Sequence, residues 1–221
     1  DIFATMHTAK EVGGDFYDFY FVDEDHFAFL MADVSGKGIP AAMFMMQSKT
    51  IIKSCAESGM SVEQVFTASN EKLCEGNDAG MFVTAWMGIL NVKTGKVLFA
   101  NAGHNPPLVK HADGTYEYLK TRAGFVLAGM EGVRYRGNEL ELAPGDAIYL
   151  YTDGVTEATD LNTELYGEDR LHTVLEKYKD AAPQVICDEV KRDVDAFVGE
   201  APQFDDITML ALKYNGQEDA Q

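Results

Sequence analysis

Four short acidic motifs, spread over nearly the whole chain, constrain the fold most. They are GGDFYD at residues 13–18, ADVSGKG at 32–38, YTDGVTEATD at 151–160 and FDDITML at 204–210. Each places an aspartate at or beside the end of an apolar run typical of a β-strand, so distant strands can direct their carboxylates to one point. Two unneutralised carboxylates about 4 Å apart repel by roughly 4 kcal/mol at an effective dielectric constant of about 20. A fold that gathers several of them needs divalent cations, and the sequence therefore predicts a hard-metal site.

The composition indicates one globular domain with an acidic surface. The chain has 221 residues, 46% of them hydrophobic, which is enough for a sizeable core. Its formal net charge of −18 argues against nucleic acid or an anionic membrane as a partner. Since no run of about 18 apolar residues occurs, we expect no direct membrane insertion by this segment. Cys55, Cys74 and Cys187 form no CxxC pair, so we expect no disulfide framework or zinc ribbon and a cytoplasmic setting.

The two ends of the chain carry separate expectations. The sequence opens in a strand-like run at residues 2–9 and lacks an initiator methionine. We therefore expect a fragment of a longer signalling protein, with a sensor or a membrane anchor in the preceding N-terminal region. Residues 215–221 are predicted to be a disordered tail, so that the domain spans residues 1–214.

Apolar alternation and turn residues predict many antiparallel strands and two pairs of helices. The expected helices lie at residues 40–58, 61–75, 168–179 and 182–198, with Ser61 as a cap and Gln64 at the capping-box position. The expected strands lie at residues 2–9, 16–22, 26–32, 82–92, 96–101, 107–111, 115–120, 134–142, 147–152 and 207–214. This pattern predicts an α+β fold in which a sandwich of two sheets is covered by helices.

Six motifs occur in an order typical of a known enzyme family. They are GGDFYD, ADVSGKG with the following IPAAMFM, FVTAWMGIL, ANAGHNPPLV, YTDGVTEA and FDDITML. From about residue 9 to residue 212 the chain resembles the bacterial serine phosphatases of the RsbU and SpoIIE type, a branch of the metal-dependent PPM (PP2C-like) phosphatases. The resemblance implies a four-layer αββα sandwich, with two antiparallel β-sheets flanked by helix pairs, and a site for two Mn²⁺ or Mg²⁺ ions.

The first two motifs would supply one part of this site. The resemblance implies that Asp15 helps to hold the second metal, that Asp33 bridges both metals, and that the carbonyl of Val34 is a further ligand. Lys10 lies at the offset where eukaryotic relatives carry a phosphate-binding arginine, although a solvated surface lysine is the alternative. Gly36 lies in a turn before a helix and is a candidate for contact with the substrate phosphate. A tight turn that only places Asp33 is the alternative for Gly36.

The later motifs would supply the rest. The resemblance implies that Asp153 and Asp205 hold the first metal and that Asp206 supports the site, but it leaves open which of Asp205 and Asp206 touches metal. His104 is either a general acid or a histidine packed in a turn. Oxygen-only ligands suit Mg²⁺ or Mn²⁺, which activate a water for in-line attack on phosphorus without a phosphoenzyme. The residues predicted to be catalytic are Asp15, Asp33, Asp153 and Asp205.

Other acidic and apolar residues are predicted to be structural. The carboxylates expected to lie in turns or at the surface are Asp18, Asp146, Asp160 and Asp169, with contact to the site as the alternative for Asp18. The helix at 40–58 begins with Met43, Phe44, Met45 and Met46, which predicts burial on more than one side. A partner or dimer surface is the alternative, because flexible methionines suit adaptable interfaces.

The resemblance implies a serine protein phosphatase that acts on a phosphorylated STAS-domain protein, an anti-sigma factor antagonist. Control by an N-terminal sensor or regulatory region of the same protein is expected, and a homodimer is a further expectation. One alternative is a catalytically silent phosphatase-like module that binds partners, and another is a hydrolase of small phosphoesters. The intact acidic motifs argue against the silent module, and the absence of a CxxxxxR sequence excludes a cysteine-phosphatase mechanism.

Overall fold

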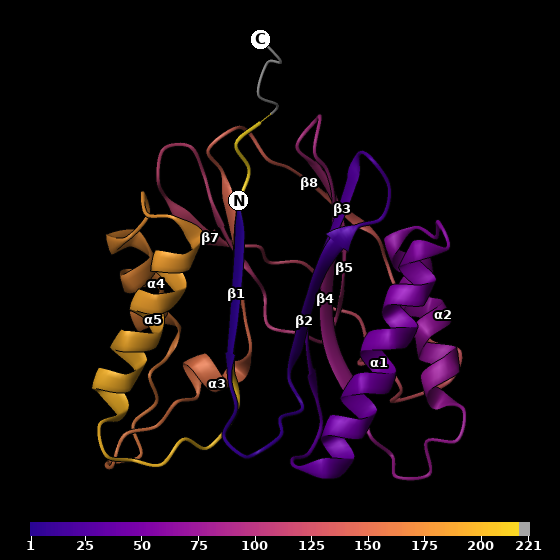
Figure 1. The fold of residues 1–221 in the computed structure, drawn as a ribbon, viewed down its shortest axis with the longest axis horizontal. Helices are drawn as coiled ribbons and strands as arrows, with labels where there is room; N and C mark the ends of the chain where they lie inside the picture. The colour runs from indigo at the N-terminus through magenta and orange to yellow at the C-terminus, as the bar shows by residue number, and fades with distance from the viewer. Residues whose placement is uncertain (217–221) are drawn as a thin grey trace. The chain divides into compact units, whose positions relative to one another are not determined.

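The computed structural model describes residues 1–216, which form two antiparallel β-sheets with helices beside each (Figure 1). The chain divides into two compact units. The first unit comprises Asp1–Ala9, Asn105–Lys120 and the described residues from Ala143 onward, and the second unit comprises Lys10–His104 and Thr121–Leu142. Each sheet belongs wholly to one unit. No helix within residues 1–216 is long and apolar enough to cross a lipid bilayer.

The second unit is a five-stranded sheet with two helices on one face (Figure 1). In sheet order its strands are β2 (Phe16–Phe21), β3 (His26–Val34), β4 (Val83–Asn91), β5 (Lys96–Ala102) and β8 (Asn138–Glu141). Its helices are α1 (Ile39–Glu57) and α2 (Val62–Cys74). Side chains alternate between the faces of a strand, so Ala28, Leu30 and Ala32 of β3 point to the helical face. They form one buried cluster with Ile52 of α1 and Phe66 of α2.

The first unit has a second five-stranded sheet and three helices. In sheet order its strands are β1 (Ile2–His7), β10 (Ile207–Lys213), β9 (Ala147–Tyr151), β6 (Leu108–Lys110) and β7 (Tyr116–Tyr118). Its helices are α3 (Asp153–Thr156), α4 (Glu168–Lys177) and α5 (Pro183–Val198). Tyr149 of β9 and Met209 of β10 are buried with Leu171 of α4 and Val190 of α5. The first strand pairs with the last, from Ile2 opposite Leu212 to His7 opposite Ile207.

The predicted fold class, α+β with two antiparallel sheets flanked by helix pairs, is confirmed. All ten expected strands and all four expected helices are present, with shifts at their ends. Gln64 Oε1 accepts a hydrogen bond from the Ser61 backbone N–H at 3.1 Å, as the capping-box position predicts. The expected strand at residues 134–142 begins only at Asn138, and the short helix α3 was not predicted.

Helix α1 differs from the expectation of burial on several sides. Phe44 and Ile52 are buried, whereas the side chains of Met43 and Met46 are 68% and 66% exposed. The helix thus uses one face for the sheet and α2 and presents an apolar face to solvent. In the expected tail, Asn215 Nδ2 donates a hydrogen bond to Asp1 Oδ2 at 2.9 Å. Residues 217–221 of that tail lie outside the described part of the chain.

Candidate functional site

The loop before β2 lies against the end of β3 in the second unit. A Cβ atom at Gly14 would lie 2.9 Å from the carbonyl oxygen of Val34, so a side chain at residue 14 would push the two segments apart. Asp15 follows directly and is only 2% exposed. Continued by one residue, the register of β2 with β3 places Asp15 opposite Asp33. Three of the predicted ligands, Asp15, Asp33 and Val34, therefore lie at one end of the same strand pair.

Beside Asp33, residues of β4, of β5 and of the turn after β5 are joined to one another by hydrogen bonds. It lies opposite Thr84 in the ladder of β3 with β4, and Thr84 Oγ1 lies 2.9 Å from His104 Nδ1. The His104 N–H donates to Asn101 Oδ1 at 2.8 Å, and Asn101 Nδ2 donates to the His104 carbonyl at 2.9 Å. With 4% exposure, His104 matches the expectation of a histidine packed in a turn. Thr84 and Asn101 were not predicted, although both lie in the quoted motifs.

The backbone conformation of the turn between β3 and α1 explains why glycines occur in it. Gly36 and Gly38 have φ of +86° and +79°, a region that favours glycine. Ser35 fixes the turn to Phe82, since its N–H donates to the Phe82 carbonyl and its Oγ accepts from the Phe82 N–H, both at 2.9 Å. This geometry favours a turn that places Asp33. Contact of Gly36 or of the exposed Lys10 with a phosphate stays a prediction.

In the first unit, the ends of β9 and β10 are joined by a threonine pair. The Thr152 N–H donates to the Thr208 carbonyl, and the Thr208 N–H donates to Thr152 Oγ1, both at 3.1 Å. Thr152 Oγ1 also donates a longer bond of 3.4 Å to the Asp206 carbonyl. Asp153 comes next, as the first residue of α3, followed by Gly154. These hydrogen bonds place the start of α3 beside the start of β10.

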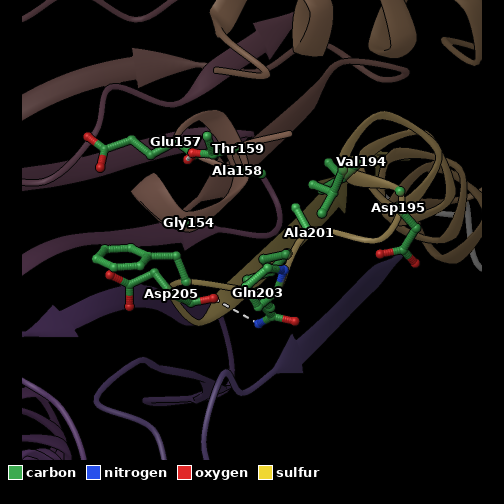
Figure 2. Close-up of a pocket in the computed structure, with 14 residues that line it drawn as sticks. Gly154, Glu157, Ala158, Thr159, Val194, Asp195, Ala201, Gln203 and Asp205 are labelled. Atoms are coloured by element: carbon green, nitrogen blue, oxygen red, sulfur yellow. Dashed lines mark hydrogen bonds between the residues drawn. The ribbon is translucent and has the colours of Figure 1, made fainter. Parts of the chain in front are cut away.

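The two aspartates before β10 hold different positions. Asp206 is 8% exposed, and its Oδ1 accepts the Ala9 N–H at 2.8 Å, which ties the chain after β1 to this turn. Asp205 Oδ1 accepts the Asp206 N–H at 2.9 Å. Gln203 Nε2 donates to the Asp205 carbonyl at 2.8 Å (Figure 2). It also donates to the His7 carbonyl at 2.7 Å. Each of the two carboxylates thus has one oxygen bonded to a backbone N–H, and which of them touches metal stays a prediction.

A pocket of about 200 Å³ opens beside Asp205 in the same unit (Figure 2). It lies between the start of α3, the C-terminal end of α5 and the loop before β10. Residues that line it include Gly154, Glu157, Val194, Asp195, Phe204 and Asp205. Ligand pockets usually measure about 300–1,000 Å³, so this one is smaller than a usual cofactor site.

The candidate ligands suit the predicted metals by their chemistry. All are carboxylate or carbonyl oxygens, the donors that Mg²⁺ and Mn²⁺ prefer. The second unit supplies Asp15, Asp33 and Val34, and the first unit supplies Asp153, Asp205 and Asp206. Within residues 1–216, no group of three or more His, Cys, Asp or Glu side chains is placed so that it could hold a metal ion. Metal ligation by this set therefore stays a prediction.

Of the carboxylates expected to lie in turns or at the surface, Asp160 and Asp169 do so. Asp18 instead lies within β2, partly buried and 3.9 Å from Lys49 Nζ, and Asp146 is buried at the end of a turn, where it accepts the Ala143 N–H at 2.8 Å. Asp160 accepts backbone N–H groups within its own turn, and Asp169 lies in the first turn of α4.

Comparisons with known proteins agree with this architecture. The family model described as Stage II sporulation protein E (SpoIIE) matches residues 23–215. The chain is 32% identical over 216 residues to phosphoserine phosphatase RsbU of Bacillus subtilis, covering 96% of this chain and 63% of the relative. The chain spans between about a third and two thirds of the curated relatives that it matches. Of the candidate ligands, only Asp15 lies outside the range of the family model.

Two solved structures share the fold. The SiaA-PP2C domain of Pseudomonas aeruginosa has a TM-score of 0.86 at 23% identity, covering 96% of this chain and 85% of that one. The RsbU and RsbW domains of a Mycobacterium tuberculosis protein also give 0.86, at 25% identity, with 99% and 62% covered. Because the family model matches most of its length, this chain belongs to the SpoIIE family of PP2C-like phosphatase domains.

Proposed function

We propose that this domain is a Mn²⁺- or Mg²⁺-dependent serine protein phosphatase. The observation that carries the proposal is the convergence of Asp15, Asp33 and Val34 at one end of the β2–β3 pair. Further support comes from the family, from the intact acidic motifs and from RsbU, a relative named a phosphoserine phosphatase.

In the proposed site, Asp15, Asp33, the Val34 carbonyl, Asp153 and Asp205 would hold two cations. When bound, such cations supply a hydroxide nucleophile near neutral pH and neutralise charge on the phosphoryl oxygens. The protein's part is to hold its oxygen donors in place, through the close approach at Gly14 and through the buried Thr152 hydroxyl. Asp206 supports the site by tying the turn before β10 to Ala9.

The proposed substrate is phosphoserine on a STAS-domain protein that regulates an anti-sigma factor. The proposed controlling element is an N-terminal regulatory region of the same protein, and a homodimer is a further proposal. These three proposals rest on the likeness to RsbU, and this chain covers 63% of the length of that relative. We further propose residues 1–214 as the extent of the phosphatase domain.

The test is phosphate release from p-nitrophenyl phosphate and from a phosphoserine STAS protein, with and without Mn²⁺. We expect turnover that a chelator and Asp153→Asn both abolish. The matched control is Asp160→Asn, which changes an exposed turn carboxylate of the same motif and should leave turnover unchanged. Calorimetric cation binding without turnover would indicate an enzyme that is switched off, and absence of both would overturn the proposal in favour of the silent module.

A further inference from the structure

Three of the five arginines of this acidic chain line one pocket of the second unit. The pocket measures about 450 Å³, and Arg122, Arg134 and Arg136 line it together with Phe125 and Met130. We call it the arginine pocket. All three arginine side chains are exposed, and none forms an ion pair with a described carboxylate. In a chain of net charge −18, three unpaired guanidinium groups at one place form a local site for an anion.

Tyr135 anchors the two neighbouring arginines. Its side chain is 6% exposed, and its hydroxyl lies 3.1 Å from the Val126 carbonyl and 3.3 Å from Asn70 Oδ1. Burial raises the pKa of this hydroxyl well above its usual value. Because Tyr135 points into the core, Arg134 and Arg136 on either side of it are directed outward, toward the pocket.

Further bonds hold the pocket wall to α2 and β4. Asn70 Nδ2 donates to the Met130 carbonyl, and Asn70 Oδ1 accepts the Ala128 N–H, both at 2.9 Å. Leu127 and Val83 of β4 exchange two backbone hydrogen bonds, of 2.8 and 2.9 Å. The wall is thus built before any ligand arrives, and a preformed site loses less conformational entropy on binding.

A continuous series of contacts joins this wall to a candidate metal ligand of the same unit. The Gly124 N–H donates to the Asn101 carbonyl at 2.8 Å, and the Asn101 side chain holds the backbone of His104. His104 contacts Thr84, which lies opposite Asp33. The arginine pocket is therefore linked, through Asn101, His104 and Thr84, to the strand pair that carries Asp33.

We propose that the arginine pocket docks a short acidic segment of the phosphoprotein substrate, apart from the phosphoserine itself. A guanidinium group binds a carboxylate through two parallel hydrogen bonds. Phe125 and Met130, which are 52% and 59% exposed, add apolar contact, and Arg, Met and aromatic residues are enriched in protein interfaces. A long polyanion such as nucleic acid would meet the negative charge of the rest of the chain, whereas a short segment need not. The identification of the partner as the substrate rests on the proposed function, but anion binding by the pocket does not.

The first measurement is fluorescence anisotropy with a labelled peptide of alternating Glu and Gly residues and one Leu, against the same peptide with Gln for Glu. We expect the acidic peptide to bind and the Gln peptide not to bind. Replacing all three pocket arginines with Gln should weaken binding about tenfold, as expected for the loss of three exposed ion pairs. The control carries the same charge change elsewhere, in Lys93→Gln, Lys177→Gln and Lys179→Gln, and should weaken binding less than about twofold. Thermal melts verify that both variants fold.

Two results would overturn docking of an acidic segment. One is equal loss of binding in the arginine and lysine variants, which would indicate a charge effect without a site. The other is that inorganic phosphate displaces the peptide and binds the pocket as tightly as the peptide does. That result would indicate a site for small anions.

The second measurement joins docking to catalysis. Phosphoserine peptides with an acidic or a Gln tail are compared, and we expect the acidic tail to lower KM several-fold with little change in kcat. The arginine variant should lose this difference between the two tails. If the wild type hydrolyses neither peptide nor p-nitrophenyl phosphate with Mn²⁺, the proposed function fails, while anisotropy still decides whether the pocket binds acidic segments. Hydrolysis without any effect of the acidic tail would overturn the substrate-docking inference alone.

Discussion

The carbonyl oxygen of Asp206 lies so close to Gly154 that a Cβ atom at residue 154 would be 2.0 Å from it. Both partners are backbone, so no rotation of a side chain can relieve the overlap. The glycine of the motif YTDG thus permits the close approach that sets the start of α3 against the turn before β10. This contact lies between the candidate ligands Asp153 and Asp205.

Replacement of Gly154 by Ala should destabilise the protein by about 1–3 kcal/mol, because the backbone must move to admit the methyl group. The free energy of unfolding from urea titration measures this. Gly137→Ala is the control, since its Cβ would meet only the Glu63 carboxylate at 2.7 Å, the far end of a flexible side chain. We expect a change within about 0.5 kcal/mol for the control. Equal effects of the two substitutions would refute the role given to Gly154.

Thr152→Val should cost about 1–3 kcal/mol of unfolding free energy, because it keeps the shape but removes the buried hydroxyl that accepts the Thr208 N–H. Thr152→Ser keeps the hydroxyl and should cost clearly less. Chemical denaturation of the three proteins side by side gives both values. A valine variant as stable as the serine variant would show that the hydroxyl contributes nothing.

Asp193 should contribute stability that depends on pH. Arg170 Nε and the Tyr166 hydroxyl donate to its Oδ2, at 2.7 and 2.9 Å. The hydrogen bond from Arg170 is the main cause that lowers the pKa of Asp193 below its usual value. The stabilisation is fully present above the pKa of an unfolded aspartate, about 3.9, and is lost as the pH falls through the lower folded-state pKa.

Asp193→Asn should therefore lose about 1 kcal/mol or less at pH 7, since the pair is partly exposed. The difference from wild type should vanish at acid pH, below the folded-state pKa of Asp193, and urea titrations at a series of pH values measure it. The control is Glu139→Gln, which removes an exposed ion pair with Lys96 and should change stability by no more than about 0.3 kcal/mol. A constant difference across the pH range would contradict this account.

Cys187 should be unreactive in the folded protein. Its side chain is fully buried, and burial raises the pKa of the thiol to about 12, so almost no thiolate exists at neutral pH. With a thiol-reactive disulfide reagent at pH 8, we expect the partly exposed Cys74 to react first and Cys187 only after denaturation. Mass spectrometry locates the label, and a Cys74→Ser variant should show no fast-reacting thiol. Rapid labelling of Cys187 would reopen the question of a cysteine nucleophile.

Much of the fold could be predicted because single strands and helices carry their own signal. In β3, apolar residues alternate onto the helical face and the strand was found, whereas α3 has four residues, too few for any periodicity to show. The run around Arg134 and Arg136 alternates like a strand, but Tyr135 packs against Phe66 and bonds Asn70, contacts that only the tertiary fold supplies. The local sequence pattern alone could not show whether this run forms a strand or an irregular segment held by tertiary contacts.

The candidate site was predicted from aspartates in ordered motifs, but the residues that support it were not. Thr84 and Thr152 have ordinary strand-end side chains, and nothing in the sequence distinguishes a hydroxyl that bonds His104 from one that faces water. Their roles depend on the partner strand, which sequence spacing does not identify. The exposure of the Met43 and Met46 side chains was not predicted for a similar reason, because the identity of an apolar residue does not show whether another element packs over it.

The pairing of β1 with β10 also sets an order of events during synthesis. Residues 10–104 carry four of the five strands of the second unit, so that unit can begin to form early. At about 5–20 residues per second, the ribosome needs about 10–40 s after β1 before it has made β10. Through that interval, β1 has no partner strand, and an unpaired edge invites association with other chains. We therefore expect nascent chains that stop short of residue 207 to be the form of this protein most in need of a chaperone.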